Sequence, residues 1–256
     1  MAAPVAKLAL KGVHKRFGDK VVLDGVDIEV APGKSLVIIG GSGQGKSVTL
    51  KIAIGLMRPD SGYVAVDGAD TTELSQRARA ENNRKFGMLF QGAALFDSLT
   101  IWENVAFRLL NADKVARKEA KARAIESLAR VGLPASVAEL YPIELSGGMQ
   151  KRAGLARAVA ATPDILFFDE PTTGLDPINA DVINDLIVEQ VKRLGCTAVS
   201  ITHDMASARK IGDEIAFLYN GKILWRGPAA EIDHTGNPYV DQFVHGRADG
   251  PIRPEV

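Results

Sequence analysis

The sequence lacks a pair of cysteines and a long apolar run. Its one cysteine, Cys196, excludes an internal disulfide and fits a reducing compartment. The residues around Cys196 are apolar, so we expect it to be part of the core. No stretch of about 18 consecutive apolar residues occurs, and residues 1–7 lack the apolar segment of a signal peptide. These absences predict a soluble chain that stays in the cytoplasm.

The chain also lacks an excess of charge of either sign, because 31 Lys and Arg residues balance 31 Asp and Glu residues. Without a basic excess, no general electrostatic field draws the chain to nucleic acid or to an anionic membrane. We therefore expect no nucleic-acid partner, and we expect membrane association only through a specific partner. The 256 residues carry ample apolar content for a sizeable core.

The first part of the chain has the pattern of β-structure followed by a strand, a loop and a helix. Apolar and polar residues alternate between Leu8 and Val30, which predicts antiparallel strands with turns near Gly18 and Gly25. The apolar run 35–40 is typical of a parallel strand that is covered on both faces. Residues 46–57 then have helical character.

Helical character dominates from about residue 91 to Pro163, and parallel-strand patterns then return. Two apolar runs near the end flank Asn220-Gly221, which predicts a hairpin. Glycine and proline after Asp233 predict a loosely structured tail. The later segments expected as strands are 63–66, 86–90, 165–169, 197–202, 215–219 and 222–225, and those expected as helices are 113–131, 148–161 and 177–194.

A glycine-rich segment matches the phosphate-loop pattern G-x-x-x-x-G-K-[ST] between a predicted strand and a predicted helix. Glycines let successive backbone N–H groups converge on a phosphate, and the helix N-terminus adds a favourable dipole. Lys46 would bridge the β- and γ-phosphates of ATP, and Ser47 would ligate Mg²⁺. The nucleotide-binding residues expected here are Gly40, Gly41, Ser42, Gly43, Gln44, Gly45, Lys46, Ser47 and Val48.

An acidic pair, Asp169-Glu170, ends the predicted buried strand 165–169. Open α/β sheets bind ligands at the carboxyl ends of their strands. Asp169 suits the coordination shell of Mg²⁺, and Glu170 would orient and polarise the attacking water. Taken in isolation, an Asp-Glu pair could also simply cap the following turn.

The segment Leu145-Ser-Gly-Gly-Met149 resembles the signature of one family, the ATP-binding cassette ATPases. Other motifs follow in the family's order along nearly the whole chain: Phe17, residues 40–47, Gln91, residues 145–149, Asp169-Glu170, residues 174–177 and His203. The resemblance implies an α/β fold with a P-loop NTPase (RecA-like) core, an N-terminal antiparallel β-subdomain and an inserted α-helical subdomain. It implies a single domain over 1–256, with the core at 5–91 and 156–232, the helical subdomain at 92–155 and a C-terminal extension at 233–256.

The resemblance also implies that Ser146, Gly147 and Gly148 contact the γ-phosphate of an ATP held by the opposite subunit. These residues precede a predicted helix and can therefore present a hydroxyl group, backbone N–H groups and a dipole. One chain carries one phosphate loop and one signature, so two complete sites require a dimer, most simply a homodimer.

Four further residues have roles that the resemblance implies. Phe17 would stack on adenine, Gln91 would sense Mg²⁺ and the attacking water, and His203 would contact the γ-phosphate. Asp176, in the segment 174–177, would lie at the dimer seam beside the nucleotide. Taken alone, a histidine in the sequence Thr-His-Asp is more often a hydrogen-bonded residue at the end of a strand.

Two positions depart from the family pattern. Met149 replaces the commoner Gln at the fifth signature position, although the phosphate-facing groups before it are intact. Phe17 replaces the frequent Tyr, which keeps a stacking face and loses a hydroxyl group. We expect catalysis to survive both changes.

The short insert between the phosphate loop and the signature favours a transporter subunit. Chromosome-type members carry very long coiled coils there, and ribosome-associated members generally carry two cassettes in one chain. In transporter members the stretch 92–105 would form a groove for a short helix of an integral membrane permease. Phe96, Leu99 and Trp102 could line this groove, or they could pack inside the helical subdomain.

Several strings are similar to the ATPase of Mla-type, MCE-associated phospholipid transporters: 40–48, 90–97, 145–149, 242–246 and 249–251. This similarity implies a peripheral subunit on the cytoplasmic side of a Gram-negative inner membrane that drives phospholipid transport between the two membranes. It implies a permease, an MCE-domain lipid-binding protein and a small cytoplasmic accessory protein as partners. An importer ATPase for a polar solute such as an amino acid is the alternative.

Two other function classes fit the motifs less well. A cassette that binds ATP as a clamp without turnover would not need both Glu170 and His203. A small P-loop kinase or GTPase would need an acceptor pocket or a guanine-reading Asn-Lys-x-Asp motif, and no such motif occurs in the sequence.

Overall fold

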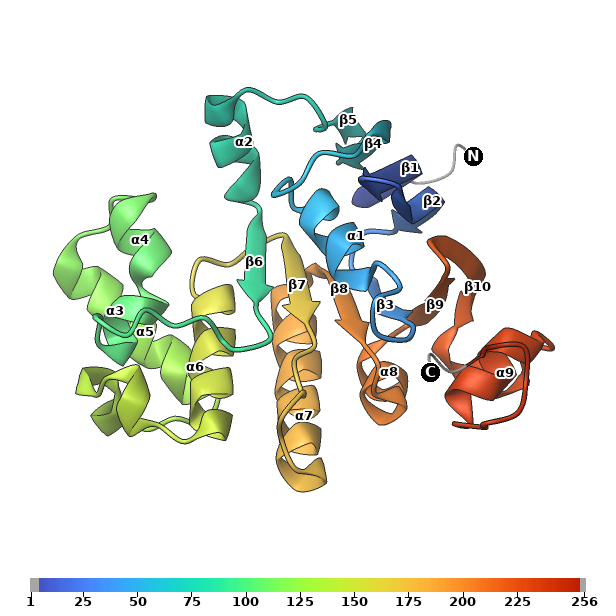
Figure 1. The fold of residues 1–256 in the computed structure, drawn as a ribbon. Helices are drawn as coiled ribbons and strands as arrows, with labels where there is room; N and C mark the ends of the chain where they lie inside the picture. Colours follow the sequence, from blue (N-terminus) through green and yellow to red (C-terminus); the bar gives the residue numbers. More distant parts are fainter. Residues whose placement is uncertain (1–4, 254–256) are drawn as a thin grey trace. The chain divides into compact units, whose positions relative to one another are not determined.

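The computed structural model describes residues 5–253 and divides into two compact units. The first unit joins the chain up to Asn83 with the chain from Thr197 onward, which are the blue-to-teal and the orange-to-red parts of Figure 1. The second unit runs from Arg84 to Cys196. The finer domain limits expected from the sequence stay a prediction.

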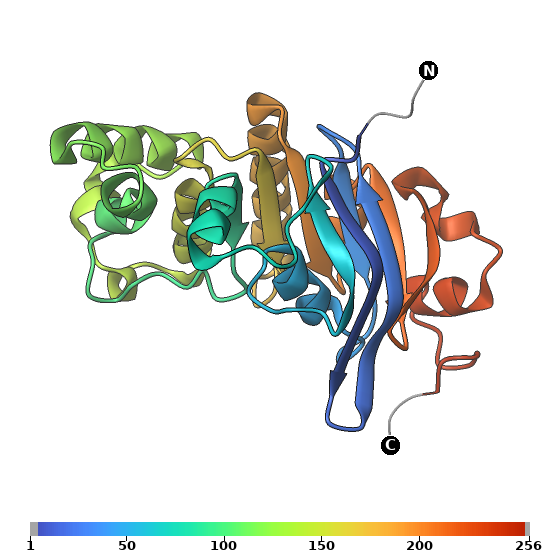
Figure 2. The ribbon, with the colours of Figure 1, turned by 90° about the horizontal axis from the view of Figure 1, so that it is seen from above.

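An antiparallel sheet with the strand order β2-β1-β4-β5 opens the first unit. β1 (Leu8–Phe17) and β2 (Lys20–Val30) form a long hairpin, seen in Figure 2, and Gly18 lies in its turn as predicted. The turn predicted near Gly25 is wrong. Gly25 lies inside β2, at φ 76°, where the register with β1 shifts, so it accommodates a bulge. The shorter strands are β4 (Ser61–Val66) and β5 (Ala69–Asp70).

The second sheet of this unit is built around β3 (Ser35–Ile39). β3 pairs in parallel with β8 (Thr197–Thr202) and β9 (Glu214–Tyr219), and all of its residues are buried. This burial explains why the sequence shows a continuous apolar run there. β9 and β10 (Lys222–Pro228) form the hairpin predicted at Asn220-Gly221. The helices of the unit before its last segment are α1 (Lys46–Ala53), α2 (Gln76–Asn83) and α8 (Met205–Ile211).

Regular structure continues to Val244, so the prediction of a loose tail directly after Asp233 is wrong. The chain forms the 3-10 turn η3 (Ala229–His234) and the helix α9 (Pro238–Val244). Pro238 fits because a helix does not need the N–H group of its first residue. The helix is anchored by Phe243, whose ring centroid lies 5.2 Å from that of Phe217, a fully buried residue of β9.

The second unit combines one strand pair with a group of helices. β6 (Phe86–Leu89) and β7 (Ile165–Asp169) pair in parallel. Cys196, at the end of the unit, is buried as expected, and burial raises the pKa of its thiol to about 11. Figure 1 shows α3 beside α5, and both contact α6. The helical segments are α3 (Ile101–Val105), α4 (Phe107–Asn111), α5 (Arg117–Arg130), η1 (Ala135–Glu139), η2 (Pro142–Glu144), α6 (Gly147–Val159) and α7 (Pro177–Leu194).

Across residues 5–253, no helix is both long enough and apolar enough to span a membrane.

The side chain of Gln242 forms hydrogen bonds with the backbone of the segment after α9. Its amide donates hydrogen bonds to the carbonyl oxygens of Arg247 and Ile252, and its carbonyl accepts one from the Ile252 N–H group at 2.7 Å. Gln242→Ala should therefore speed amide exchange at Ile252 about fivefold, which corresponds to the loss of about 1 kcal/mol of local stability. Hydrogen-exchange mass spectrometry measures this change.

Gln242→Glu is the matched control, because it keeps an acceptor for the Ile252 N–H group and loses the donors. Its exchange should lie between those of the parent and the alanine variant. Equal exchange in all three proteins would contradict the anchoring role of Gln242.

Candidate functional site

The phosphate loop lies between β3 and α1, as the sequence predicts. A Cβ atom at Gly40 would lie 2.3 Å from the carbonyl oxygen of Leu218, so the backbone passes too close to β9 for any side chain. Gly45 precedes α1 at φ 101°, a conformation that glycine adopts without strain. Ser42, Gly43 and Ser47 are exposed, while Gly41 and Val48 are half-buried. The loop thus turns sharply and presents its outer face at the start of a helix.

The Lys46 ammonium group lies against the loop itself. Lys46 is only 7% exposed, and its Nζ donates to the carbonyl oxygens of Gly40 at 2.7 Å and Gly41 at 2.9 Å. The Gln44 side chain fixes the other side of the loop, because its Oε1 accepts a hydrogen bond from the Asn220 N–H group at 2.6 Å. Binding of phosphate by Lys46 would exchange these nearby carbonyl oxygens for phosphate oxygens.

Two other predicted residues belong to the same unit. Phe17 ends β1 and is 48% exposed, with the Lys15 ammonium 5.7 Å from its ring centroid. His203 is exposed directly after β8. The next residue, Asp204, caps α8 by accepting hydrogen bonds from the N–H groups of Ala206 and Ser207, both at 3.1 Å. The cap fixes the chain direction immediately after His203.

The acidic pair lies at the end of β7 in the second unit. Asp169 is half-buried and Glu170 is buried. Glu170 has φ 47°, a left-handed conformation that is strained for a residue with a side chain. The Thr173 hydroxyl donates to Glu170 Oε2 at 3.2 Å, and the Thr173 N–H group donates to the Glu170 carbonyl oxygen at 3.2 Å. The Glu170 carboxylate is therefore held by its own turn.

Gln91 follows β6 and is exposed. The loop after it contains two successive left-handed residues, Ala93 (φ 59°) and Ala94 (φ 48°). Helix α6 holds this loop through two cationic side chains: Lys151 donates to the Gln91 carbonyl oxygen, and Arg157 donates to those of Ala93 and Ala94. Sequence reasoning missed Lys151, because no pattern in the sequence links it to Gln91.

The signature residues form the start of α6. Ser146 is the N-cap, and its Oγ accepts a hydrogen bond from the Met149 N–H group at 3.4 Å. A Cβ atom at Gly147 would meet nothing within 4 Å, and one at Gly148 would approach only Asn179 Oδ1, at 3.8 Å. The chain's own packing therefore does not require glycine at either position. A ligand or partner that approaches the backbone N–H groups would require it.

Asp176 caps the neighbouring helix α7. Its carboxylate accepts hydrogen bonds from the N–H groups of Ile178 and Asn179, both at 3.1 Å, and from the Asn179 amide at 2.5 Å. The bond from the Asn179 side chain is the main reason why the pKa of Asp176 is lowered. Asp176 therefore sets where α7 begins, and its predicted contact with nucleotide stays a prediction.

Phe96, Leu99 and Trp102, which could line a groove or pack inside the helical subdomain, differ in their exposure. Trp102 is buried, with the guanidinium carbon of Arg117 4.7 Å from its ring centroid. Phe96 is 45% exposed and pairs with the exposed Phe107 at a centroid distance of 4.6 Å. Leu99 is half-buried. Trp102 thus packs inside the helical group, while Phe96 and Phe107 leave apolar surface outside.

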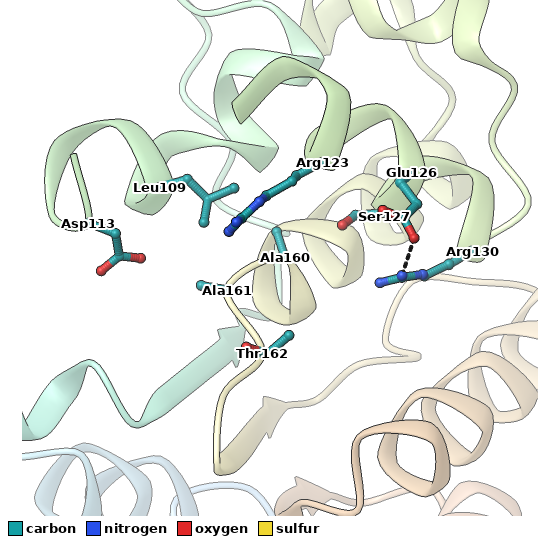
Figure 3. Close-up of a pocket in the computed structure, with 9 residues that line it drawn as sticks. All are labelled: Leu109, Asp113, Arg123, Glu126, Ser127, Arg130, Ala160, Ala161 and Thr162. Carbon is teal, nitrogen blue, oxygen red and sulfur yellow. Dashed lines mark hydrogen bonds and ion pairs between the residues drawn. The ribbon is translucent and has the colours of Figure 1, made fainter. Parts of the chain in front are cut away.

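A pocket of about 480 Å³ lies elsewhere in the second unit, where α4, α5 and the end of α6 meet (Figure 3). Its charged lining residues are Asp113, Arg123, Glu126 and Arg130. Arg130 pairs with Glu126, and Arg123 pairs with Glu119 at 2.6 Å. No predicted site residue lines this pocket, and its charges are balanced, so it indicates no ligand class.

The phosphate loop and the acidic strand end, carried by an α/β chain, define a P-loop ATPase. The ABC transporter family model matches residues 23–173, and the chain belongs to this family. A solved dimeric, post-hydrolysis structure of the ATP-binding cassette MJ0796 with ADP and Pi has a TM-score of 0.80 and 33% identity. The match covers 87% of this chain and 98% of that one, and it confirms the predicted fold class. The chain is thus an ABC ATPase, which binds ATP and couples its hydrolysis to transport.

The similar proteins of this chain indicate which kind of ABC ATPase it resembles. The chain is 36% identical to the intermembrane phospholipid transport system ATP-binding protein MlaF of Escherichia coli (strain K12), over 98% of this chain and 94% of MlaF. It is 40% identical to Arabidopsis thaliana protein TRIGALACTOSYLDIACYLGLYCEROL 3, chloroplastic, over 95% of this chain and 74% of that protein. It is 42% identical to the methionine import ATP-binding protein MetN of Carboxydothermus hydrogenoformans, over 87% of this chain and 66% of MetN. The predicted resemblance to Mla-type ATPases is confirmed.

The cap at Asp204 generates a prediction for the residues next to His203. Burial raises the pKa of Asp204, but hydrogen bonds from Ser207 and Ala206 outweigh burial and lower the pKa overall. The carboxylate therefore stabilises the fold above the ordinary carboxyl pKa, and this contribution is lost as the pH falls through the lowered value. Asp204→Ala should cost about 1 kcal/mol at pH 7 in urea unfolding.

Asp204→Asn removes the negative charge and keeps an N-cap side chain, since asparagine is also a good N-cap residue. Its deficit relative to the parent should shrink below about pH 4, where the unfolded parent becomes protonated. A deficit that stays constant with pH would contradict a charged cap.

Proposed function

We propose that the chain is the ATP-binding and ATP-hydrolysing subunit of a transporter that moves phospholipid between the inner and outer membranes of a Gram-negative envelope. The similarity to MlaF carries this proposal, because it extends over 94% of that protein. The alternative is an importer ATPase for a polar solute such as an amino acid. MetN supports it with 42% identity, but a third of MetN has no counterpart in the match.

ATP is proposed to bind at residues 40–48, with its β- and γ-phosphates on the loop N–H groups and on Lys46. Phe17 offers an exposed ring face for adenine. The donor chemistry also fits Mg²⁺, which prefers oxygen ligands such as the Ser47 hydroxyl, the Gln91 amide and the Asp169 carboxylate. When bound, the ion would neutralise charge on the phosphates.

Hydrolysis needs a group that aligns water with the γ-phosphate. We assign this role to Glu170, whose carboxylate is buried and held by Thr173. Gln91 would report on the ion and the water, and His203 would contact the γ-phosphate. The low exposure of Glu170 and its contact with Thr173 support the assignment, because they limit the ways in which the side chain can move away from the reaction.

The second half of each site is proposed to come from a twin subunit. Ser146, Gly147 and Gly148 lie at a helix start, and the chain's own packing does not explain the two glycines. Ile178, next to the segment of Asp176, is 78% exposed, as expected of a residue that a partner covers. A symmetric homodimer would complete two sites at once.

The remaining partners are proposed from the Mla-type resemblance. The exposed pair Phe96 and Phe107 would face a permease, which would hold the subunit at the cytoplasmic face of the inner membrane. An MCE-domain lipid-binding protein and a small cytoplasmic accessory protein would complete the complex. Nucleic acid is not among the expected partners.

Glu170→Gln tests the assigned chemistry. The amide keeps the size of the side chain and cannot polarise water as a carboxylate does, so turnover should fall on the order of 100-fold or more. ATP affinity should stay near that of the parent, and ATP-bound dimers should accumulate. Phosphate release, nucleotide binding and size-exclusion chromatography with light scattering measure the three quantities.

Lys46→Ala provides the contrast, because it removes a phosphate contact and should weaken ATP binding itself. Normal hydrolysis by Glu170→Gln would refute the role of Glu170. Loss of turnover without dimer accumulation would refute the shared site.

The substrate is tested by purifying the chain with its natural membrane partners and analysing bound small molecules by mass spectrometry. Phospholipid should copurify with the complex. The amount of phospholipid per complex should change when Glu170→Gln traps the ATP-bound form. A matched complex with Phe96→Glu should be recovered in lower yield. Recovery of a hydrophilic solute-binding protein and no enriched lipid would favour the importer alternative.

A further inference from the structure

Lys151 is a buried lysine in the second turn of α6, in the same unit as Gln91 and Glu170. It is 6% exposed, and its ammonium donates hydrogen bonds to two backbone carbonyl oxygens, one of Gln91 and one of Glu170, the latter at 3.5 Å. One side chain thus touches the peptide groups of two of the residues to which roles in hydrolysis are assigned. The two acceptors come from segments that are far apart in the sequence.

Burial of an ammonium group is unfavourable, and this cost needs an explanation. Burial lowers the pKa of Lys151, while the negative charges of Asp169 and Glu170 oppose this effect. An uncharged side chain of similar length, such as methionine, would fill the same space without desolvating a charge. The hydrogen bonds to Gln91 and Glu170, together with the attraction between the ammonium and the charges of Asp169 and Glu170, are what distinguishes lysine from methionine at this position.

The loop that Lys151 contacts contains two unfavourable backbone conformations. Its residues Ala93 and Ala94 are both left-handed, which is unfavourable for residues with a Cβ atom. Arg157, two turns further along α6, donates to both of their carbonyl oxygens, at 2.6 and 2.7 Å. Gly154 lies between Lys151 and Arg157 in α6, and a Cβ atom at Gly154 would be 3.1 Å from the Cβ atom of Ala93. Helix α6 therefore determines the path of the loop after Gln91.

The second acceptor belongs to another strained residue. Glu170 is left-handed, and its carbonyl oxygen accepts from the Thr173 N–H group as well as from Lys151. The direction of this carbonyl fixes the orientation of the peptide group that follows the Glu170 Cα atom, and the side chain is attached to this Cα atom. A cation beside the carbonyl therefore helps to determine where the carboxylate points.

We propose that Lys151 is a positioning residue for ATP hydrolysis, whose ammonium group holds the backbone of Gln91 and of Glu170 in their working geometry. The proposal rests on the roles assigned above to those two residues. Lys151 touches neither nucleotide nor water in this scheme. It acts through the carbonyl oxygens, so it should affect the rate of the chemical step and leave ATP binding nearly unchanged.

The test compares Lys151→Met and Lys151→Arg in the full-length chain, with turnover expressed per ATP-binding site. Lys151→Met should lower kcat about 10- to 100-fold, the range expected from a small misplacement of a catalytic group, with the KM for ATP within about twofold of the parent. Lys151→Arg keeps a cationic donor and should restore kcat to within about threefold of the parent. Lys192→Met, which removes an exposed lysine at the end of α7, should behave like the parent.

A double variant separates positioning from a general structural role. If Lys151 works through Glu170, Lys151→Met should have little further effect on the residual turnover of Glu170→Gln. A structural defect would instead lower turnover equally in both backgrounds and would persist in Lys151→Arg. If Lys151→Met does not fold, Lys151→Gln takes its place with the same expected outcomes.

Two results would overturn the proposal: parental kcat in Lys151→Met, or a fully additive loss in the double variant. Failure of the underlying assignment is recognised separately, because Glu170→Gln alone would then hydrolyse ATP normally. Inactive Glu170→Gln together with fully active Lys151→Met would reject the positioning role alone.

Discussion

The close approach of two backbone segments at Gly40 constrains the whole nucleotide-binding loop. With the Leu218 carbonyl oxygen 2.3 Å from any Cβ atom at this position, β3 can end beside β9 only if residue 40 is glycine. Gly45 is subject to the same constraint, because a Cβ atom there would lie 2.8 Å from Leu23 Cδ2. Both ends of the loop are therefore held close to neighbouring strands, and hydrogen bonds of the Gln44 and Lys46 side chains support the loop between them.

Helix α6 imposes a comparable constraint on the second unit. The helix begins at the signature glycines, and Gly154 lets it approach β6 so closely that a Cβ atom there would lie 2.8 Å from Leu89 Cδ1. The same Cβ atom would lie 3.1 Å from that of Ala93, in the segment after Gln91. Lys151 and Arg157 then bind main-chain oxygens on either side of this contact. A displacement of the helix start would therefore move the residues after β6 with it.

Much of this arrangement is visible in the sequence because it depends on local patterns. Strand β8 and helix α7 begin and end where their apolar runs and their flanking glycine and proline residues predict. Gly25 and the segment after Asp233 were misjudged because glycine and proline mark bulges and helix starts as well as turns. Lys151 was invisible for a different reason. Its acceptor on Gln91 is a carbonyl group 60 residues away, and every residue has a carbonyl group.

The two buried lysines, Lys46 and Lys151, show why similar contacts can have different consequences. Each donates to two main-chain carbonyl oxygens, but those of Lys46 lie 5 and 6 residues earlier, in its own loop. Phosphate oxygens can replace such neighbours without moving another element. The acceptors of Lys151 lie 60 and 19 residues away, at the ends of two different strands. Release of these acceptors by Lys151 would remove one contact from each of the two segments that follow these strands. A local set of contacts therefore suits a residue that must bind ligand, and a long-range set suits one that must hold the site still.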